Sequence, residues 1–336
     1  MKKYVVGILG ATGLVGREIV SMRLARNFPV ERLVPLASSR SAGTVQTFGD
    51  QSITVQKAEP QSFKGIDILF ASAGGNISRE LAPEAVRAGC VVIDNTSAFR
   101  MEPHVPLVVP EVNAHALKQH QGLIANPNCS TAQLVVALKP LHDAFTIKRV
   151  VVSTYQAVSG AGNQAVEELY MQSEQVLGGQ QPQPQVLPLR IAFNVIPYIG
   201  SFLENGYTDE EMKMTNEVRK IMEADIATCA TCIRVPVANG HSESVNIEFA
   251  QPVSPERARE VLANAPGIVV RDDPKLRHFP YPQDISGSDP VYVGRIRRDV
   301  SHPNAINLWV VADNLRKGAA LNAIQIAESL IEQGLI

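Results

Sequence analysis

The sequence predicts an α/β protein in two parts: a doubly wound parallel sheet, followed by an α+β region with a mostly antiparallel sheet. In the first part, apolar runs of strand length at residues 4–9, 32–37, 66–71 and 90–94 alternate with helical patterns such as residues 17–26 and 78–88. After residue 128, long β-branched strands follow one another with few helices between them, at residues 148–159, 232–237, 243–251, 291–297 and 307–313.

Composition limits the function classes. The chain has 336 residues, enough for about two domains, and its 45% hydrophobic and 19% charged content is typical of globular proteins. A net charge of −2 argues against nucleic-acid and anionic-membrane partners. The apolar runs are too short for a membrane span, and the N-terminus lacks a signal-peptide cleavage pattern, so we expect a cytoplasmic protein.

Three glycines, Gly10, Gly13 and Gly16, connect the first strand to the first helix. Such glycines allow a tight turn and close approach of a pyrophosphate to the helix N-terminus, as in a Rossmann-type dinucleotide-binding unit. Their GxxGxxG spacing differs from GxGxxG, and glycines can also simply mark a turn between a strand and a helix. The position directly after an apolar strand favours dinucleotide binding.

The second strand ends in a polar segment that contains Ser38, Arg40 and Ser41 and no acidic residue. A site that prefers NAD would carry an acidic side chain near this point for the ribose 2′-hydroxyl. A guanidinium among hydroxyls instead suits a 2′-phosphate, so the sequence predicts NADP. The alternative is that Arg40 is a solvated side chain in a polar loop.

Cys129 lies between an Asn-Pro-Asn turn at residues 126–128 and a helix predicted for residues 130–139. The N-terminus of a helix stabilises a thiolate, and its free amides can bind an oxyanion. These properties predict a nucleophile for acyl chemistry, with the amides of Asn128 and Cys129 as oxyanion donors. The alternative is a small, buried and inert cysteine.

His241 follows Gly240, whose lack of a side chain allows another group to approach closely. A histidine beside a cysteine nucleophile can act as general base and acid, but the sequence alone does not place His241 beside Cys129. Arg234, on the strand before it, can bind a carboxylate through two hydrogen bonds.

Two other polar features have both a functional and a structural interpretation. Arg100 follows a strand end and can bind phosphate or form a surface salt bridge. Glu210 and Lys213 can belong to a functional site or form a solvated helical pair.

Cys229 and Cys232 have the spacing of a metal or redox pair, but no second pair of Cys or His residues accompanies them. We therefore interpret them as packed strand residues and predict no metal site.

Taken together, these segments are similar to the aspartate-semialdehyde dehydrogenase family over nearly the whole chain. The matching motifs occur in the same order as in the family, at residues 10–16, 94–100, 106–113, 126–131, 153–162, 210–214, 234–241 and 310–317. The segment at residues 178–188 is short where some members carry an insertion, which indicates the compact branch of the family.

The resemblance implies a function and an architecture. The family reduces aspartyl phosphate with NADPH to aspartate semialdehyde and phosphate, in lysine, diaminopimelate, threonine, methionine and isoleucine biosynthesis. The resemblance further implies a glyceraldehyde-3-phosphate-dehydrogenase-like fold with an NADP-binding domain of residues 1–127 and 315–336. Residues 128–314 would form the catalytic and dimerisation domain of a homodimer or tetramer. Independently of the resemblance, the apolar pattern of residues 318–333 predicts a final helix that packs on the first domain.

The resemblance also implies roles for individual residues. Cys129 would form the acyl-thioester, Gln156 would orient the substrate and His241 would be the acid/base. Arg234 would bind the substrate carboxylate and Glu210 its amino group, while Arg100 and Lys213 would bind phosphate. The implied cofactor contacts are Gly10, Thr12, Gly13, Leu14, Val15, Ser38, Arg40, Ser41, Ser159, Gly160 and Asn314.

Two alternatives remain open. N-acetyl-glutamyl-phosphate reductase shares the fold and the thioester chemistry, although Glu210, Lys213 and Arg234 favour the shorter aminoacyl phosphate. The second alternative is a non-catalytic paralogue that acts as a binding protein. Such relatives tend to lose the nucleophile, whereas this chain has Cys129, Gln156 and His241 together.

Overall fold

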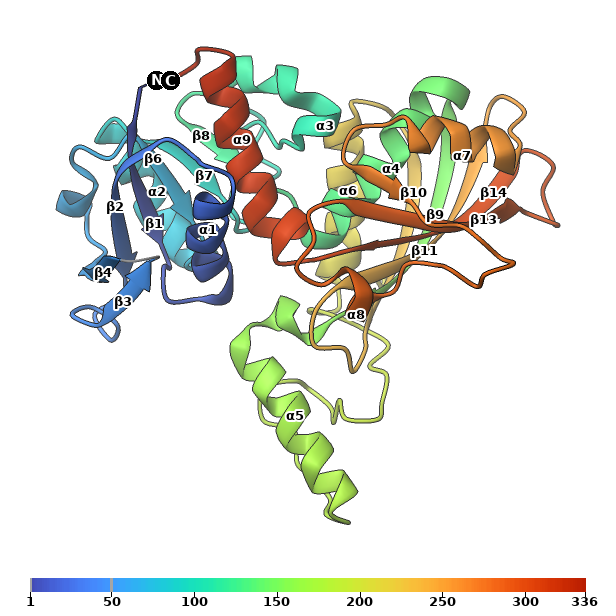
Figure 1. Ribbon diagram of the computed structural model, residues 1–336, viewed down its shortest axis with the longest axis horizontal. Helices are drawn as coiled ribbons and strands as arrows, with labels where there is room; N and C mark the ends of the chain where they lie inside the picture. Colours follow the sequence, from blue (N-terminus) through green and yellow to red (C-terminus); the bar gives the residue numbers. More distant parts are fainter. Residues whose placement is uncertain (1, 49–50) are drawn as a thin grey trace. The chain divides into compact units, whose positions relative to one another are not determined.

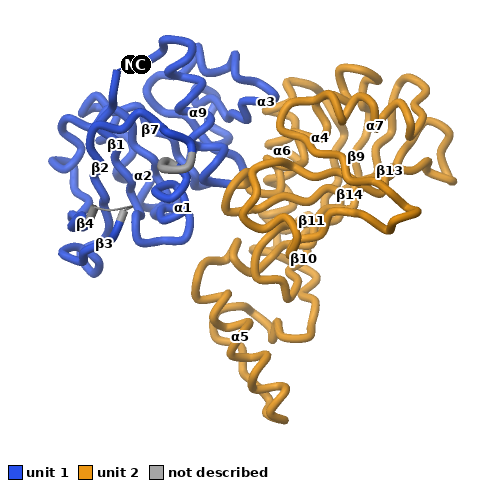
Figure 2. The backbone as a smooth tube through the Cα atoms, viewed as in Figure 1, with its two compact units in different colours: residues 1–128, 319–336 blue, residues 129–318 orange. Residues whose placement is uncertain are grey.

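The chain forms two compact units, which are described separately. The computed structural model describes residues 2–48 and 51–336. The first unit comprises Met1–Asn128 and Ala319–Ile336, and the second comprises Cys129–Gly318 (Figure 2). The C-terminal segment therefore belongs to the same unit as the N-terminal half.

The first unit is built on a six-stranded sheet in which every neighbouring pair is parallel. β1 lies between β2 and β6, so the strand order reverses at β1, as the prediction of a doubly wound sheet requires (Figure 1). The strands, in spatial order, are β5 (Gln56–Lys57), β2 (Val30–Ala37), β1 (Tyr4–Leu9), β6 (Ile68–Ala71), β7 (Val91–Asp94) and β8 (Leu123–Ala125).

Helices cover both faces of this sheet because its central strands are apolar on both sides. On β6, Ile68 and Phe70 belong to the cluster that includes α1 (Leu14–Ala25) and α9 (Leu321–Glu332), whereas Leu69 faces the cluster that includes α2 (Gly75–Arg87). The unit also contains the hairpin β3 (Val45–Phe48) and β4 (Gln51–Thr54) and the short helices η1 (Pro60–Phe63), α3 (Pro110–Asn113) and η2 (Ala114–Gln119).

The second unit contains a six-stranded mixed sheet. Its three inner pairings are antiparallel and its two outer pairings are parallel, which confirms the prediction of a mostly antiparallel sheet. The strands, in spatial order, are β10 (Ala227–Arg234), β9 (Ile147–Gln156), β11 (His241–Phe249), β14 (Ala305–Ala312), β13 (Val291–Arg298) and β12 (Ile268–Val270).

Helices pack on one face of the second sheet, where alternate strand residues are buried. Phe145, at the end of α4, packs edge-on against Phe249 of β11, with ring centroids 5.8 Å apart. The helices of this layer are α4 (Cys129–Phe145), α6 (Asp209–Met222) and α7 (Pro255–Ala263). α5 (Asn163–Leu177) lies next to the segment that follows it (Figure 1), and the two pack around a smaller apolar cluster. The remaining elements of this unit are η3 (Val158–Ala161), α8 (Pro282–Ile285) and the π-helical η4 (Arg316–Ala320).

Some boundaries differ from those expected from the sequence. α1 and α2 begin three residues earlier than predicted, at Leu14 and Gly75, because each helix starts directly after its glycine-containing turn. Residues 318–333, expected to form one helix, are divided between η4 and α9. Within residues 2–48 and 51–336, every helix is too short or too polar to cross a membrane.

Candidate active site

The connection from β1 into α1 requires glycine at two positions, one in the turn and one in the first turn of the helix. Gly10 has φ of 91°, and a Cβ atom there would lie 2.7 Å from the carbonyl oxygen of Ser72. A Cβ atom at Gly16 would lie 2.4 Å from the carbonyl oxygen of Gly10. The turn therefore places the start of α1 at the strand-order reversal, where phosphates bind in doubly wound folds. Of the predicted cofactor residues, Gly10, Thr12 and Gly13 lie in this turn, and Leu14 and Val15 are the first residues of α1.

The other predicted cofactor segment of the first unit follows β2, the neighbour of β1. The amide nitrogens of Ser41 and Ala42 each donate to the carbonyl oxygen of Ser38 over 3.0 Å, and Arg40 is exposed in this turn. Because β1 and β2 are parallel, both turns lie at the same edge of the sheet. A 2′-phosphate near the β1 turn would therefore have a cation and hydroxyls beside it.

Arg100 is buried, so it is not the partner in a surface salt bridge that the sequence left as an alternative. Its Nε atom donates to the carbonyl oxygen of Asn126 and its Nη2 atom to that of Asn95, each over 2.9 Å, and only 7% of the residue is exposed. Burial raises the pKa of the nearby Asp94 carboxyl, although hydrogen bonds from Thr96 and the charge of Arg100 act against this rise. These contacts fix the guanidinium at the carboxyl ends of β7 and β8.

Cys129 is the first residue of α4, immediately after the buried Asn128. Cys129 forms no disulfide and is half-buried, and its position as first residue places it at the positive end of a 17-residue helix. Gly318 packs closely against it: a Cβ atom at residue 318 would lie 2.8 Å from the Cβ atom of Cys129. A larger residue at 318 would displace the cysteine.

His241 begins β11 and is completely buried. Its Nδ1 atom accepts a hydrogen bond of 3.0 Å from the amide of Ala157, and its Nε2 atom has no hydrogen-bond partner within the described part of the chain. Burial, and then the positive charge of Arg234, lower the pKa of His241 well below its usual value. The ring is therefore neutral at pH 7, and its Ala157 bond places the proton on Nε2.

Gly160 allows the backbone of η3 to approach this histidine. A Cβ atom at Gly160 would lie 3.3 Å from His241 Nε2 and 3.1 Å from Arg234 Nη1. Gly160 is thus a neighbour of both Arg234 and His241, although more than 70 residues separate it from them in the sequence.

Gln156 and Arg234 end the adjacent strands β9 and β10 and are paired in register. The Nε2 atom of Gln156 donates to Glu210 Oε1 over 3.4 Å, and Nη1 of Arg234 donates to the carbonyl oxygen of Ala157 over 2.8 Å. Burial lowers the pKa of the Arg234 guanidinium, while negative charge at Cys129 and Glu210 opposes this shift. The strand register therefore places the Gln156 amide beside the Arg234 guanidinium, and the charges of Glu210 on α6 and Cys129 on α4 act on that guanidinium.

Lys213 and Glu210 lie on the first turns of α6. The lysine Nζ atom is 3.2 Å from Glu210 Oε2 and 2.6 Å from Asp209 Oδ2. Only 8% of Glu210 is exposed, so this pair is not the solvated helical pair considered as an alternative. Asp209 was not predicted as a site residue, although its spacing of four residues from Lys213 on a helix is a signal that would have found it.

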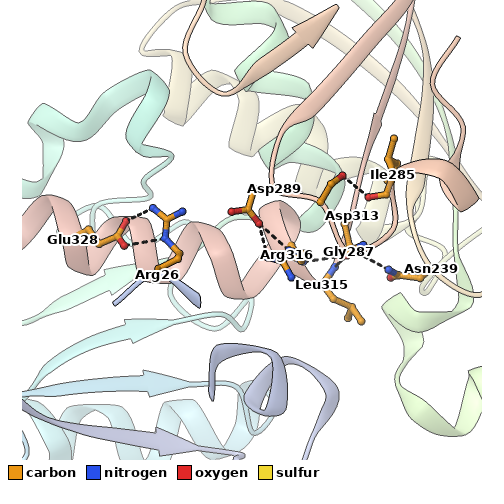
Figure 3. A network of polar contacts seen from close by, with 10 residues as sticks. Arg26, Asn239, Ile285, Gly287, Asp289, Asp313, Leu315, Arg316 and Glu328 are labelled. Atoms are coloured by element: carbon orange, nitrogen blue, oxygen red, sulfur yellow. Dashed lines mark hydrogen bonds and ion pairs between the residues drawn. The ribbon is translucent and has the colours of Figure 1, made fainter. Parts of the chain in front are cut away.

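Ser159 and Asn314, predicted as cofactor contacts, meet in the second unit. Asn314 Nδ2 donates to Ser159 Oγ over 2.9 Å, and Asn314 Oδ1 accepts from the amide of Gly240 over 2.8 Å. Figure 3 shows how the neighbouring Asp313 fixes this segment: its carboxylate accepts from the side chain of Asn239 over 2.7 Å. Asp313 lies in the motif at residues 310–317 but was not predicted as a site residue.

The other three cysteines lie in packing or hydrogen-bonding contacts and are not predicted site residues. Cys229 contacts the hydroxyl of Tyr207 over 3.4 Å, whereas Cys232 is buried against Met214. Burial raises the pKa of Cys90 to about 11, which makes a poor nucleophile. Within residues 2–48 and 51–336, no three His, Cys, Asp or Glu side chains form a group that could hold a metal ion.

Comparison with known proteins identifies both halves of the chain. Residues 5–120 match the family described as semialdehyde dehydrogenase, NAD binding domain, and residues 138–317 match semialdehyde dehydrogenase, dimerisation domain. Aspartate-semialdehyde dehydrogenase of Bacillus subtilis is 51% identical over 340 residues, which cover 98% of each chain.

Solved structures show the same similarity. A Vibrio cholerae aspartate semialdehyde dehydrogenase II, complexed with ASA, has a TM-score of 0.96 and 46% identity over 99% of each chain. A Candida albicans aspartate semialdehyde dehydrogenase with NADP has a TM-score of 0.79 and 30% identity over the whole of both chains. Because these matches span both units, this chain belongs to the aspartate-semialdehyde dehydrogenase family.

Proposed function

We propose that this chain reduces L-aspartyl 4-phosphate to L-aspartate 4-semialdehyde and phosphate, reversibly and with NADPH, through an acyl-thioester on Cys129. The observation that carries the proposal is the placement of Cys129 at a helix N-terminus within one unit that also orders Gln156, Arg234 and His241. The similarity to enzymes of this name over the full chain supports the same reaction. The reaction serves lysine, diaminopimelate, threonine, methionine and isoleucine biosynthesis.

The first step forms the thioester. The Cys129 thiolate attacks the acyl carbon, the carbon–sulfur bond forms, and the carbon–oxygen bond to phosphate breaks. Lys213 and Arg100 each supply a cation that stabilises the departing dianion. The helix N-terminus stabilises the thiolate before attack, and the amides of Asn128 and Cys129 bind the oxyanion.

His241 accepts the thiol proton at Nε2 in this proposal. In the neutral ring the Ala157 hydrogen bond holds the proton on Nε2, so acting as a base requires the tautomer with its proton on Nδ1 and release of that bond. A substrate that contacts Nε2 would favour this change, because catalytic hydrogen bonds often become well aligned only in the substrate complex.

The second step reduces the thioester. When bound, NADPH supplies the hydride for this reduction. Gln156 orients the thioester carbonyl, and a proton from His241 neutralises the oxygen as charge develops on it. The hemithioacetal then returns its O–H proton to His241, its carbon–sulfur bond breaks, and the aldehyde leaves with Cys129 restored as a thiolate.

Substrate recognition explains the preference for an aspartyl group. Arg234 binds the α-carboxylate through its planar guanidinium, and Glu210 binds the ammonium group. N-acetyl-glutamyl phosphate lacks this ammonium group and would leave the buried Glu210 carboxylate without a cation from the substrate. The buried carboxylate therefore favours aspartate semialdehyde over the N-acetylated alternative.

NADP fits the residues of the first unit. Side chains are excluded at Gly10 in the β1 turn and at Gly16 in α1, so a pyrophosphate can approach the backbone at the start of α1, and Arg40 with Ser38 and Ser41 suits the 2′-phosphate. We assign NADP binding to residues 1–127 and 315–336, and catalysis and dimerisation to residues 128–314. Ser159, Gly160 and Asn314 add cofactor contacts from the second domain.

We further propose a cytoplasmic homodimer. The matched dimerisation domain contains exposed apolar side chains that a second copy would bury, on α5 and in the segment after it: Tyr170, Met171, Leu177, Phe193, Val195 and Phe202. A reducing compartment keeps Cys129 as a thiol, as the reaction requires.

The direct test is phosphate-dependent reduction of NADP with L-aspartate semialdehyde. The proposal predicts turnover that requires phosphate and is much slower with N-acetyl-glutamate semialdehyde. Faster turnover of the N-acetylated aldehyde would support the reductase instead. Absence of turnover with both, together with failure of substrate to protect Cys129 from a thiol reagent, would indicate a non-catalytic paralogue.

A further inference from the structure

Lys213 is held by two carboxylates from the preceding turn of α6. Its Nζ atom is 2.6 Å from Asp209 Oδ2 and 3.2 Å from Glu210 Oε2. The two carboxylates differ in their surroundings: 11% of the Glu210 side chain is exposed, against 40% of the Asp209 side chain. Glu210 also accepts from Gln156, so it is part of the buried substrate site, whereas Asp209 reaches Lys213 from the solvent side.

Asp209 is fixed in this position by a second contact. Its Oδ1 atom accepts from the amide of Ser201 over 2.6 Å, and its own amide donates to the carbonyl oxygen of Ser201 over 3.0 Å. Gly200 has φ of 83°, and a side chain there would overlap the Asp209 carboxylate. The Asp209 carboxylate is therefore held between the 200–201 turn and Lys213.

Both groups of this ion pair are charged at neutral pH. Burial acts to raise the pKa of Asp209, but hydrogen bonds from Lys213 and Ser201 outweigh it and lower that pKa. Burial acts to lower the pKa of Lys213, but the charge of Glu210 and the hydrogen bond to Asp209 outweigh it and raise that pKa. An incoming anion thus meets a lysine that already has a carboxylate partner.

We propose that Asp209 is an internal competitor for the phosphate group: it occupies Lys213 when phosphate is absent and must yield when phosphate binds. Asp209 then sets the affinity for phosphate and speeds its departure after thioester formation, because it neutralises Lys213 again. This proposal rests on the proposed function, in which Lys213 binds phosphate. It assigns Asp209 a role in anion affinity and none in the bond-making steps.

The test variant is Asp209→Asn. The amide keeps an acceptor for the Ser201 amide and removes the charge, and the helix cap is unaffected because Thr208 and Glu211 form a separate capping box. We expect KM for phosphate in aldehyde oxidation to fall about threefold or more, because phosphate no longer competes with the Asp209 carboxylate for Lys213. A change of this size matches the usual strength of a partly exposed ion pair. Inorganic phosphate should also bind more tightly in calorimetric titration of the protein without aldehyde.

The matched control is Asp143→Asn. Asp143 forms an ion pair of 2.6 Å with Lys139 at the same spacing of four residues on α4, and it is not a predicted site residue. Its loss should leave KM for phosphate unchanged. If Asp209→Asn does not fold, Asp209→Ser removes the same charge with a small side chain.

The outcomes separate this proposal from the proposed function. An active wild type with an unchanged or higher KM for phosphate in the folded Asp209 variant would overturn the competitor role. A wild type without phosphate-dependent turnover would instead overturn the proposed function. An equal fall of KM in the Asp143 variant would show that general surface charge, and not Asp209, controls phosphate affinity.

Discussion

The two units build their functional residues in opposite ways. In the first unit, the candidate NADP contacts lie in two short segments, residues 10–15 and 38–41, each directly after a parallel strand; the first segment is a turn and the start of α1. In the second unit, Cys129, Gln156, Arg234 and His241 come from α4 and from three strands of one sheet. A local turn depends on its own residues, whereas the second site depends on strand register across more than a hundred residues.

The units also differ in the groups that they provide. The first unit provides backbone amides and an exposed guanidinium, which suit phosphates in contact with water. The second unit provides buried charges and a neutral histidine, whose chemistry depends on the exclusion of water. Substitutions should therefore separate cofactor binding from chemistry, and the following predictions test that separation from the largest effect to the smallest.

Cys129→Ala should abolish turnover and leave NADP binding nearly unchanged, because the nucleophile belongs to the second unit. Turnover is measured by the phosphate-dependent assay, and NADP affinity by calorimetric titration. Cys229→Ala is the control, since it removes a half-buried thiol of the same unit and should retain activity. Retained turnover in Cys129→Ala would rule out the thioester route.

His241→Ala should lower kcat by about two to four orders of magnitude, the usual contribution of a general acid/base. The pH–rate profile of the variant should lose the ionisation of the base, and a profile unchanged from wild type would assign that role to another group.

Stability provides a second measurement for His241. Its pKa is lowered in the folded state, so below about pH 6.5 the unfolded chain binds more protons, and the free energy of unfolding falls as pH falls. Thermal unfolding of His241→Ala should show a weaker loss of stability in this range than the wild type shows. An equal loss would mean that other groups cause the acid sensitivity.

Gly16→Ala should raise KM for NADP about tenfold or more and lower the free energy of unfolding by about 1–3 kcal/mol, because its Cβ would lie 2.4 Å from a carbonyl oxygen. The reaction of Cys129 with a thiol reagent should be unchanged. Gly13→Ala is a control for stability alone, since its Cβ would lie at an ordinary 3.4 Å from Gly10. Equal destabilisation by both variants would contradict the steric explanation.

Arg40→Ala should weaken NADP binding about tenfold and NAD binding little, because only NADP carries the 2′-phosphate. Titration of both cofactors measures the ratio, with exposed Arg17 on α1 replaced by alanine as the control. Equal weakening of both cofactors would remove the structural reason for NADP preference.

The sequence was sufficient for those parts of the fold that depend on local pattern. The alternation of strands and helices predicted the parallel sheet, and the glycine spacing predicted the β1 turn, because backbone geometry there excludes side chains. Cys129 was expected just before its helix and is instead the first residue of that helix. In either position the positive end of the helix dipole stabilises a thiolate at Cys129.

Other features required the structure because they arise from tertiary contacts. The pairing of Gln156 with Arg234 depends on the register of two strands separated by α5 and α6. The Nδ1 bond of His241 depends on the position of the Ala157 amide, which no local motif specifies. The carboxylate of Asp209 became notable only when its contact with Lys213 was seen, although its helical spacing was visible in the sequence.

The measurement that tests the central claim most directly is intact-mass analysis of the protein mixed rapidly with aspartyl phosphate in the absence of NADPH and quenched in acid. The proposed mechanism predicts one aspartyl group per chain, mapped by peptide analysis to Cys129 and absent from Cys129→Ala. Active enzyme that carries no acyl group, or that carries it on another residue, would contradict the account.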